Sequence, residues 1–213
     1  SKDYAFIREY LHYNFGLELP EKLRPLTSSK LSLFARKYKI KDWVSFLSGL
    51  KKSLNDEIVD DFIDIFVVGH TSFFRNRKQF DFLKKTILPE FLSTNSSNET
   101  IDLRIWSAGC STGEEPYSIL ISLMEYFGKN YSDIICGVLA TDISQKSLDN
   151  AIRGQYANVK AGSKIKQYLA PYIRNVGDET FEIKKSVRKE VTFRKFNLTK
   201  GIYPFKDRFH IIF

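Results

Sequence analysis

The chain has 213 residues, of which 43% are hydrophobic and 27% are charged, a balance that indicates a globular protein and excludes a mainly disordered one. No apolar run approaches the roughly 20 residues that cross a bilayer, and the chain does not start with a signal-peptide pattern, so we expect a soluble cytoplasmic protein without membrane insertion. The net charge of +8 favours acidic partners, but it does not separate nucleic acid from an acidic protein surface.

The first third of the chain is predicted to form a small helical bundle. Apolar residues recur at helical spacing over residues 2–66, and Asp42 and Asn55 are placed as N-caps of two of the helices. A further helix is expected over about Arg77–Leu92, and the polar run 93–98 after it indicates an exposed loop.

After this loop the pattern changes to alternating strands and helices, which is typical of an α/β fold with a covered parallel sheet. The predicted strands are Leu103–Ser107, Ile134–Thr141 and Phe209–Phe213, and the predicted helices are Tyr117–Phe127 and Ser144–Ile152. Two further segments, Thr180–Lys184 and Val191–Phe196, are predicted to pair as an antiparallel hairpin. Because three parallel strands with an apolar end would be poorly covered, we expect C-terminal sequence to be missing after Phe213.

The turn between the first of these strands and its helix has the form of a nucleotide-binding turn, but it carries acids. Helix N-termini attract anions, and here Glu114 and Glu115 occupy that place. Gly109 and Gly113 give G-x-x-x-G, which is neither the dinucleotide pattern nor a P-loop. A ligand with an adenosine, no phosphate and a positive centre fits both the acids and a close approach at Gly109. S-adenosylmethionine is such a ligand.

A third acid ends the next predicted strand. Asp142 follows Leu139-Ala140-Thr141, where a carboxylate can accept hydrogen bonds from both ribose hydroxyls of a nucleoside. Other roles remain open at this point. Glu114 and Glu115 could be first-turn acids that complement the helix dipole, and Asp142 could be a helix N-cap.

The motif turn, Ile105–Ser118, carries a family resemblance together with two other segments, Thr71-Ser72-Phe73-Phe74-Arg75 and Asn197-Leu198. The chain resembles the CheR family, the chemotaxis receptor glutamate O-methyltransferases. The resemblance implies methyl transfer from S-adenosylmethionine to receptor glutamates, which gives glutamate methyl esters and S-adenosylhomocysteine.

The resemblance also implies a domain organisation. Residues 1–70 would form a helical substrate-recognition domain, and residues 71–213 would form a Rossmann-like S-adenosylmethionine-dependent methyltransferase domain that is incomplete at its C-terminus. A small antiparallel β-subdomain would be inserted at about residues 156–196.

The residues expected to bind the cofactor follow from the matching motifs and, for Gly109, from the glycine spacing: they are Thr71, Arg75, Gly109, Glu115, Asp142, Asn197 and Leu198. Arg75 is also the candidate catalytic residue, because it could hold the cofactor's carboxylate or the incoming glutamate. The acceptor is a carboxylate that is already ionised at neutral pH, so no general base is expected. Two cysteines and three histidines show no metal-ligand spacing, and no metal is expected.

A run of seven basic residues without an acid spans Lys22–Lys41. Within it, Lys30, Arg36 and Lys37 are candidates for docking the chain, as a monomer, onto acidic cytoplasmic helices of methyl-accepting receptors. A solvated helix face is the alternative for this run.

Two other functions remain open for the whole chain. One is a non-catalytic receptor-binding module of the same fold. The other is a nucleic-acid methyltransferase, which the absence of an Asn/Asp-Pro-Pro-aromatic segment and of a Pro-Cys nucleophile argues against, so no nucleic-acid partner is expected.

Overall fold

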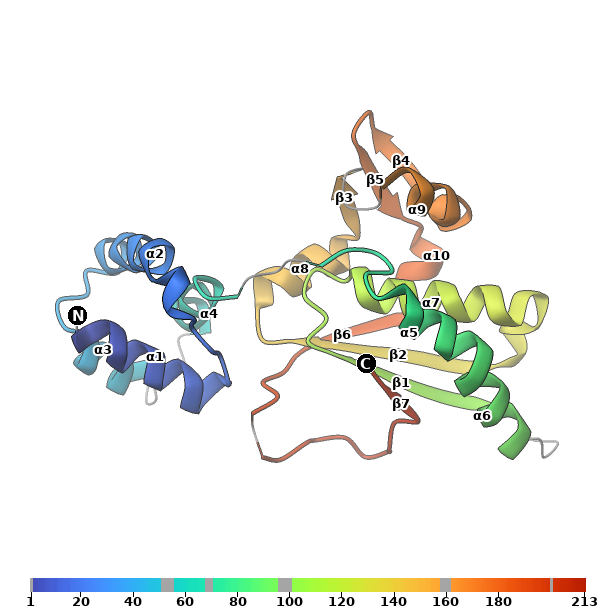
Figure 1. The fold of residues 1–213 in the computed structure, drawn as a ribbon, viewed down its shortest axis with the longest axis horizontal. Helices are drawn as coiled ribbons and strands as arrows, with labels where there is room; N and C mark the ends of the chain where they lie inside the picture. The colour runs from blue at the N-terminus through green and yellow to red at the C-terminus, as the bar shows by residue number, and fades with distance from the viewer. Residues whose placement is uncertain (1, 51–55, 68–70, 96–100, 158–161, 200) are drawn as a thin grey trace. The chain divides into compact units, whose positions relative to one another are not determined.

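The computed structural model describes residues 2–50, 56–67, 71–95, 101–157, 162–199 and 201–213 (Figure 1). The chain forms two compact units, which are described separately. One contains Ser1–Val68 with Asn197–Tyr203, and the other contains Gly69–Phe196 with Pro204–Phe213. The predicted cap Asn55, and the predicted loop from residue 96 onward, lie outside the described residues.

The first unit is a helical bundle, as predicted. Its elements are α1 (Lys2–Phe15), the short 3-10 helix η1 (Glu21–Leu23), α2 (Arg24–Lys37), α3 (Trp43–Leu50) and α4 (Asp56–Asp64). The bundle is held together by buried apolar side chains from each α-helix, among them Tyr4, Ile7, Leu11, Leu31, Phe34, Leu47 and Phe62. The predicted cap at Asp42 is confirmed, because its Oδ2 accepts a hydrogen bond of 2.7 Å from the backbone N–H of Ser45.

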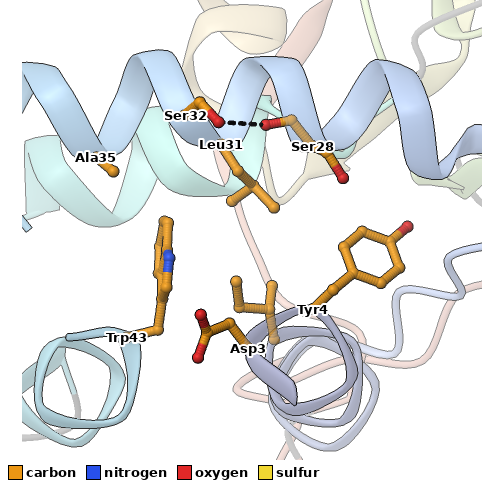
Figure 2. Close-up of a pocket in the computed structure, with 8 residues that line it drawn as sticks. Asp3, Tyr4, Ser28, Leu31, Ser32, Ala35 and Trp43 are labelled. Carbon is orange, nitrogen blue, oxygen red and sulfur yellow. Dashed lines mark hydrogen bonds between the residues drawn. The ribbon is translucent and has the colours of Figure 1, made fainter. Parts of the chain in front are cut away.

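Aromatic rings fill much of this core. The ring of Phe34 lies 5.7 Å from that of Phe46 and 5.6 Å from that of Phe62, measured between centroids. Beside these rings a pocket of about 240 Å³ is lined from α1, α2 and α3 by Asp3, Tyr4, Ile7, Ser28, Leu31, Ser32, Ala35 and Trp43 (Figure 2). The edge-to-face contact of Phe34 with Phe46 and its tilted contact with Phe62 stabilise the small bundle beyond the area that the rings bury.

The second unit is built on a parallel sheet with strand order β6-β2-β1-β7 (Figure 1). Its strands are β1 (Asp102–Ala108), β2 (Ile135–Asp142), β6 (Val191–Lys195) and β7 (Ile211–Ile212). The predicted antiparallel hairpin is wrong, because β6 pairs in parallel with β2, with Val191 opposite Val138. An alternating pattern identifies a half-buried strand but does not say which strand is its partner.

Helices cover one face of this sheet. They are α5 (Arg77–Phe82), the π-helical turn η2 (Leu83–Ile87), α6 (Leu88–Thr94), α7 (Glu114–Phe127) and α8 (Gln145–Arg153), with a 3-10 segment η3 (Gly128–Asp133) after α7. The predicted helix from Arg77 is therefore confirmed, with a π turn in its middle. Under α7 lie the fully buried side chains of Ile105 and Ala140, so the burial of this face is what fixes the register of β1 and β2.

The other face of the sheet carries an aromatic cluster. The ring of Trp106 lies 5.0 Å from that of Phe205 and 5.5 Å from that of Phe209. Its indole Nε1 donates a hydrogen bond of 2.9 Å to the Oγ1 of Thr141. The buried indole therefore has the partner that its polar atom requires.

A small antiparallel sheet with strand order β3-β5-β4 belongs to the same unit and lies on the α7 side of the main sheet (Figure 1). Its strands are β3 (Gln155–Ala157), β4 (Ile173–Gly177) and β5 (Thr180–Ile183), and α9 (Gly162–Leu169), the 3-10 turn η5 (Ala170–Tyr172) and α10 (Lys185–Arg188) accompany them. A buried carboxylate joins these elements, because Glu182 forms ion pairs with Arg188 at 2.7 Å and with Arg174 at 3.1 Å.

Across the described ranges, no helix combines the length and the apolar character that a membrane crossing requires.

Candidate active site

The site begins at the turn that joins β1 to α7. The backbone N–H groups of Gly109 and Cys110 both donate to the carbonyl oxygen of Thr141, each over 2.8 Å, so the turn is fixed to the end of β2. Gly109 has a φ of +91°, and a Cβ built on it would meet no atom within 4 Å. The turn thus leaves open space beside Gly109 into which a ligand can come close to the backbone.

Gly113 serves packing instead. Its φ is +94°, and a Cβ there would lie 2.7 Å from the Cβ of Ala151 and 3.0 Å from the hydroxyl oxygen of Tyr156. That hydroxyl also donates to the carbonyl oxygen of Thr112 over 2.7 Å. Gly113 therefore lets α8 and β3 pack directly against the turn.

The two acids of the turn have different surroundings. Glu114 is fully buried, and its Oε2 accepts a hydrogen bond of 2.6 Å from the Oγ1 of Thr112. Glu115 is partly exposed, and its Oε1 accepts a hydrogen bond of 2.8 Å from the Oγ of Ser107 in β1. Both lie in the first turn of α7, as predicted. Of the two, Glu115 is the one whose carboxylate is accessible to a ligand.

Asp142 is the last residue of β2 and is 7% exposed. Its Oδ2 accepts from the backbone N–H of Ser111 over 2.7 Å, and its Oδ1 accepts from the backbone N–H of Ser144 over 2.9 Å. The alternative role as a helix cap is wrong, because the cap of α8 is Ser144, whose Oγ accepts from the N–H of Ser147. Each carboxylate oxygen of Asp142 keeps a lone pair for a further donor.

The segment with Thr71 and Arg75 is joined to α7. The backbone N–H of Phe74 donates to the Oγ of Ser118 over 3.1 Å, and that hydroxyl donates to the carbonyl oxygen of Glu114 over 2.6 Å. Phe74 has a φ of +52°, a conformation that costs energy in a residue other than glycine. Thr71 is partly buried and Arg75 is exposed.

The structure does not place Asn197 and Leu198 in the compact unit that holds this turn. The Nδ2 of Asn197 donates to the carbonyl oxygen of Asn14 over 2.8 Å, and its Oδ1 accepts from the backbone N–H of Thr199 over 3.0 Å. Leu198 is 41% exposed. The carboxamide of Asn197 is therefore bonded to the C-terminal end of α1.

The two cysteines are not activated as nucleophiles. Burial raises the pKa of the Cys136 thiol to about 12 and raises the pKa of the Cys110 thiol as well, so neither forms a thiolate at neutral pH. The described residues contain no group of His, Cys, Asp and Glu side chains that could hold a metal ion.

Two of the three predicted docking residues have partners within the helical unit. Lys30 donates from its Nζ to the carbonyl oxygen of Ile65 over 3.3 Å. Lys37 forms an ion pair with Asp61, and this hydrogen bond raises the pKa of the lysine. Arg36 is exposed.

Helix α2 also carries two exposed leucines that were not predicted as part of the docking surface. Leu26 is 57% exposed and Leu33 is 58% exposed, one heptad apart, while Leu31 and Phe34 of the same helix are buried. The signal available in the sequence was the seven-residue spacing of Leu26 and Leu33, which puts both leucines on one side of the helix.

Ser107 and Ser111 were also not predicted as site residues. The bond from Ser107 to Glu115 and the bond from the N–H of Ser111 to Asp142 do not follow from a local sequence pattern.

The residues at the turn fit S-adenosylmethionine. Gly109 leaves open space, Glu115 presents an accessible carboxylate, and Asp142 is already oriented by two N–H groups. The Oγ of Ser111, in the same turn, is buried and bonds to no atom of the described chain. A phosphate beside these carboxylates would be repelled, whereas a sulfonium is attracted.

Comparisons with known proteins agree with this geometry. Residues 69–213 match the family described as "CheR methyltransferase, SAM binding domain". A chemotaxis protein methyltransferase of Borreliella burgdorferi is 36% identical over 95% of this chain and 72% of its own length. One from Listeria monocytogenes is 31% identical over 95% of this chain and 73% of its own. Chemotaxis protein methyltransferase Cher2 of Pseudomonas putida is 29% identical over 99% of this chain and 76% of its own.

The match covers both the turn and the sheet on which it is built, and the relatives extend over the helical unit as well. The chain therefore belongs to the CheR methyltransferase family and carries its S-adenosylmethionine-binding domain.

Proposed function

We propose that this chain transfers the methyl group of S-adenosylmethionine to glutamate side chains of chemotaxis receptors, with glutamate methyl esters and S-adenosylhomocysteine as products. The observation that supports it most is the pair of carboxylates, Glu115 and Asp142, beside the open space at Gly109, in a chain that matches the S-adenosylmethionine-binding domain of its family. The related proteins carry the name chemotaxis protein methyltransferase.

Each candidate site residue has a role in this proposal. Asp142 accepts hydrogen bonds from the ribose hydroxyls, for which its two oriented oxygens each keep a lone pair. Glu115 faces the polar groups of the cofactor. The segment that carries Thr71 and Arg75 is joined to α7 by the hydrogen bond from the N–H of Phe74 to Ser118. In this proposal Thr71 contacts the cofactor, and Arg75 holds an anion, either the cofactor's carboxylate or the incoming glutamate. For Asn197 and Leu198 a cofactor contact stays a prediction.

The proposed methyl transfer does not require general acid–base catalysis by the protein. When bound, S-adenosylmethionine supplies a methyl group on a sulfonium, which an ionised glutamate can attack directly. A glutamate with a pKa of about 4.3 needs no general base at neutral pH. The two described histidines have other partners: His12 pairs with Glu18, and the Nδ1 of His210 accepts from the N–H of Arg104. The chain's contribution is alignment of the reacting groups.

The receptor surface is proposed to be the exposed face of α2. Arg36 supplies an exposed positive charge, and Leu26 and Leu33 supply exposed apolar side chains on the same helix. An acidic amphipathic helix of a receptor's cytoplasmic domain has the matching chemistry, with carboxylates for the arginine and apolar side chains for the leucines.

One experiment tests this function against its rivals. The chain is incubated with S-adenosylmethionine labelled in the methyl group, together with receptor cytoplasmic fragments or with nucleic acid. Label that appears on the receptor and is released by mild base is expected, because a carboxylate ester is base-labile. Replacement of the receptor glutamates by glutamine provides the matched control and should abolish labelling.

The other outcomes have distinct readings. Label on nucleic acid would identify a nucleic-acid methyltransferase. Receptor binding without label, by a chain that binds S-adenosylhomocysteine in a calorimeter, would identify a non-catalytic receptor-binding module.

A further inference from the structure

We propose that Ser107 is a positioning residue of the cofactor site that acts through Glu115: its hydroxyl holds one oxygen of that carboxylate so that the other faces the bound cofactor. The inference rests on the proposed function, since it requires that S-adenosylmethionine binds at this turn.

The position of Ser107 in the sheet makes this contact possible. Ser107 is the last but one residue of β1 and is fully buried. Its side chain lies on the face of the sheet that α7 covers, and its Oγ donates to the Oε1 of Glu115 over 2.8 Å. A strand and a helix that the turn connects are thus joined again by their side chains.

Glu114 and Glu115 differ in their hydrogen-bond partner and in their exposure. The carboxylate of Glu114 is held by Thr112 and is fully buried. Glu115 is held by Ser107 from the sheet and stays partly exposed. In the described part of the chain the Oε2 of Glu115 bonds to no protein atom, so this oxygen is available to a ligand.

The hydroxyl restricts a side chain that would otherwise move freely. A glutamate has three side-chain torsions, and fixing them on binding costs conformational entropy. A donor that fixes them beforehand lowers this cost and strengthens the binding. A buried serine hydroxyl in turn requires a partner, which Glu115 supplies.

A double-mutant cycle on cofactor affinity tests this. S-adenosylhomocysteine binding is measured by calorimetry for the full chain, Ser107→Ala, Glu115→Ala and the double variant. Loss of this preorganising hydrogen bond should weaken binding by about tenfold in Ser107→Ala, because the side chain of Glu115 must then be ordered when the ligand binds. In the Glu115→Ala background the same change should alter affinity by less than about twofold, because the residue through which it acts is gone.

Two further variants guard against effects on folding. Ser122→Ala is the matched control, because Ser122 is also fully buried and donates to a backbone oxygen of Ser118 within α7. Its affinity for S-adenosylhomocysteine should equal that of the wild type. Ser107→Cys keeps a polar hydrogen at this position in a slightly larger side chain and donates more weakly, so it should weaken binding in the same direction as Ser107→Ala. Urea unfolding reports the stability of each variant.

Unchanged affinity in Ser107→Ala, or an equal loss with and without Glu115, would overturn the inference while leaving the proposed function in place. Failure of the wild-type chain to bind S-adenosylhomocysteine at all would overturn the proposed function, and the role of Ser107 with it.

Discussion

The backbone N–H of Ser111 donates a hydrogen bond of 2.7 Å to the Oδ2 of Asp142, which fixes the turn after β1 to the end of β2. Ser111 achieves this with a φ of +47°, a left-handed conformation that a serine adopts at some cost. The carboxylate of Asp142 is therefore oriented before any ligand arrives, and binding needs no rearrangement of it.

Asp142→Asn should weaken S-adenosylhomocysteine binding by about 10- to 100-fold, because an amide replaces one charged acceptor and charge-assisted hydrogen bonds contribute about 1.5–3 kcal/mol. Calorimetry at a temperature where circular dichroism shows the variant folded measures this. Asp149→Asn is the control, since Asp149 is exposed on α8 and bonds to Gln145. Equal affinity in both variants would remove Asp142 from the site.

The two glycines of the turn should respond differently to alanine. Gly113→Ala places a Cβ 2.7 Å from that of Ala151, so it should lower the free energy of unfolding by more than the roughly 1–3 kcal/mol of backbone strain alone. Gly109→Ala meets no atom, so its effect on stability should be confined to that strain.

Gly109→Ala should nevertheless lower cofactor affinity more than Gly113→Ala does among folded molecules, because its methyl group enters the space proposed for the ligand. Urea unfolding and calorimetry on both variants measure the two quantities. If Gly109→Ala binds S-adenosylhomocysteine as the wild type does, the ligand does not approach this glycine.

Glu182 should make the antiparallel sheet sensitive to acid. Burial alone would raise the pKa of this carboxyl, but the hydrogen bond from Arg174 and the charges of Arg188 and Arg174 outweigh it and lower the pKa. A lowered folded-state pKa contributes stability that is present above the unfolded value, about 4.3, and is lost as the pH falls through the folded value.

Glu182→Gln should therefore destabilise the protein at pH 7, and the difference from the wild type should shrink as the pH falls below about 4. Urea unfolding across this pH range measures it, with the exposed Glu179→Gln as control. A difference between wild type and variant that does not change with pH would show that Glu182 contributes through packing and not through its charge.

The helices and the parallel strands could be predicted because each is encoded in its own residues. The helical spacing of apolar residues indicated α1 to α4 of the bundle, and the glycines and acids of Gly109–Glu115 indicated the turn. Strands β3 and β4 were missed because β3 has only three residues, too few to establish an alternation, and four of the five residues of β4 are exposed. The partner of β6 depends on residues more than 40 positions away, beyond the reach of local pattern.

In the site, too, some features could be predicted from the sequence and others could not. The positions of Asp142 and Glu115 could be predicted, because the first ends β2 and the second lies in the first turn of α7, and the pattern revealed both elements. The bond from Ser107 to Glu115 could not, because a serine in an apolar strand has no identifiable partner until the helix is in place. The carboxamide of Asn197 bonds to Asn14, a contact across most of the chain length that no motif indicates.

Arg36→Glu should lower the methylation rate of receptor fragments. Arg36 is exposed on α2, while Lys30 and Lys37 already have partners in Ile65 and Asp61. We expect kcat/KM to fall by about tenfold at low ionic strength and by less at 0.5 M salt, because exposed charges more than a few ångströms apart are screened there. S-adenosylhomocysteine affinity should not change, since the substitution leaves the turn intact.

Lys129→Glu supplies the matched control, because Lys129 is an exposed cation in the other compact unit and its reversal changes the net charge equally. If both variants slow methylation to the same extent, the effect is that of total charge on the encounter. If neither does, the basic run of α2 is a solvated helix face. Only a loss confined to Arg36→Glu supports docking of an acidic receptor helix on this surface.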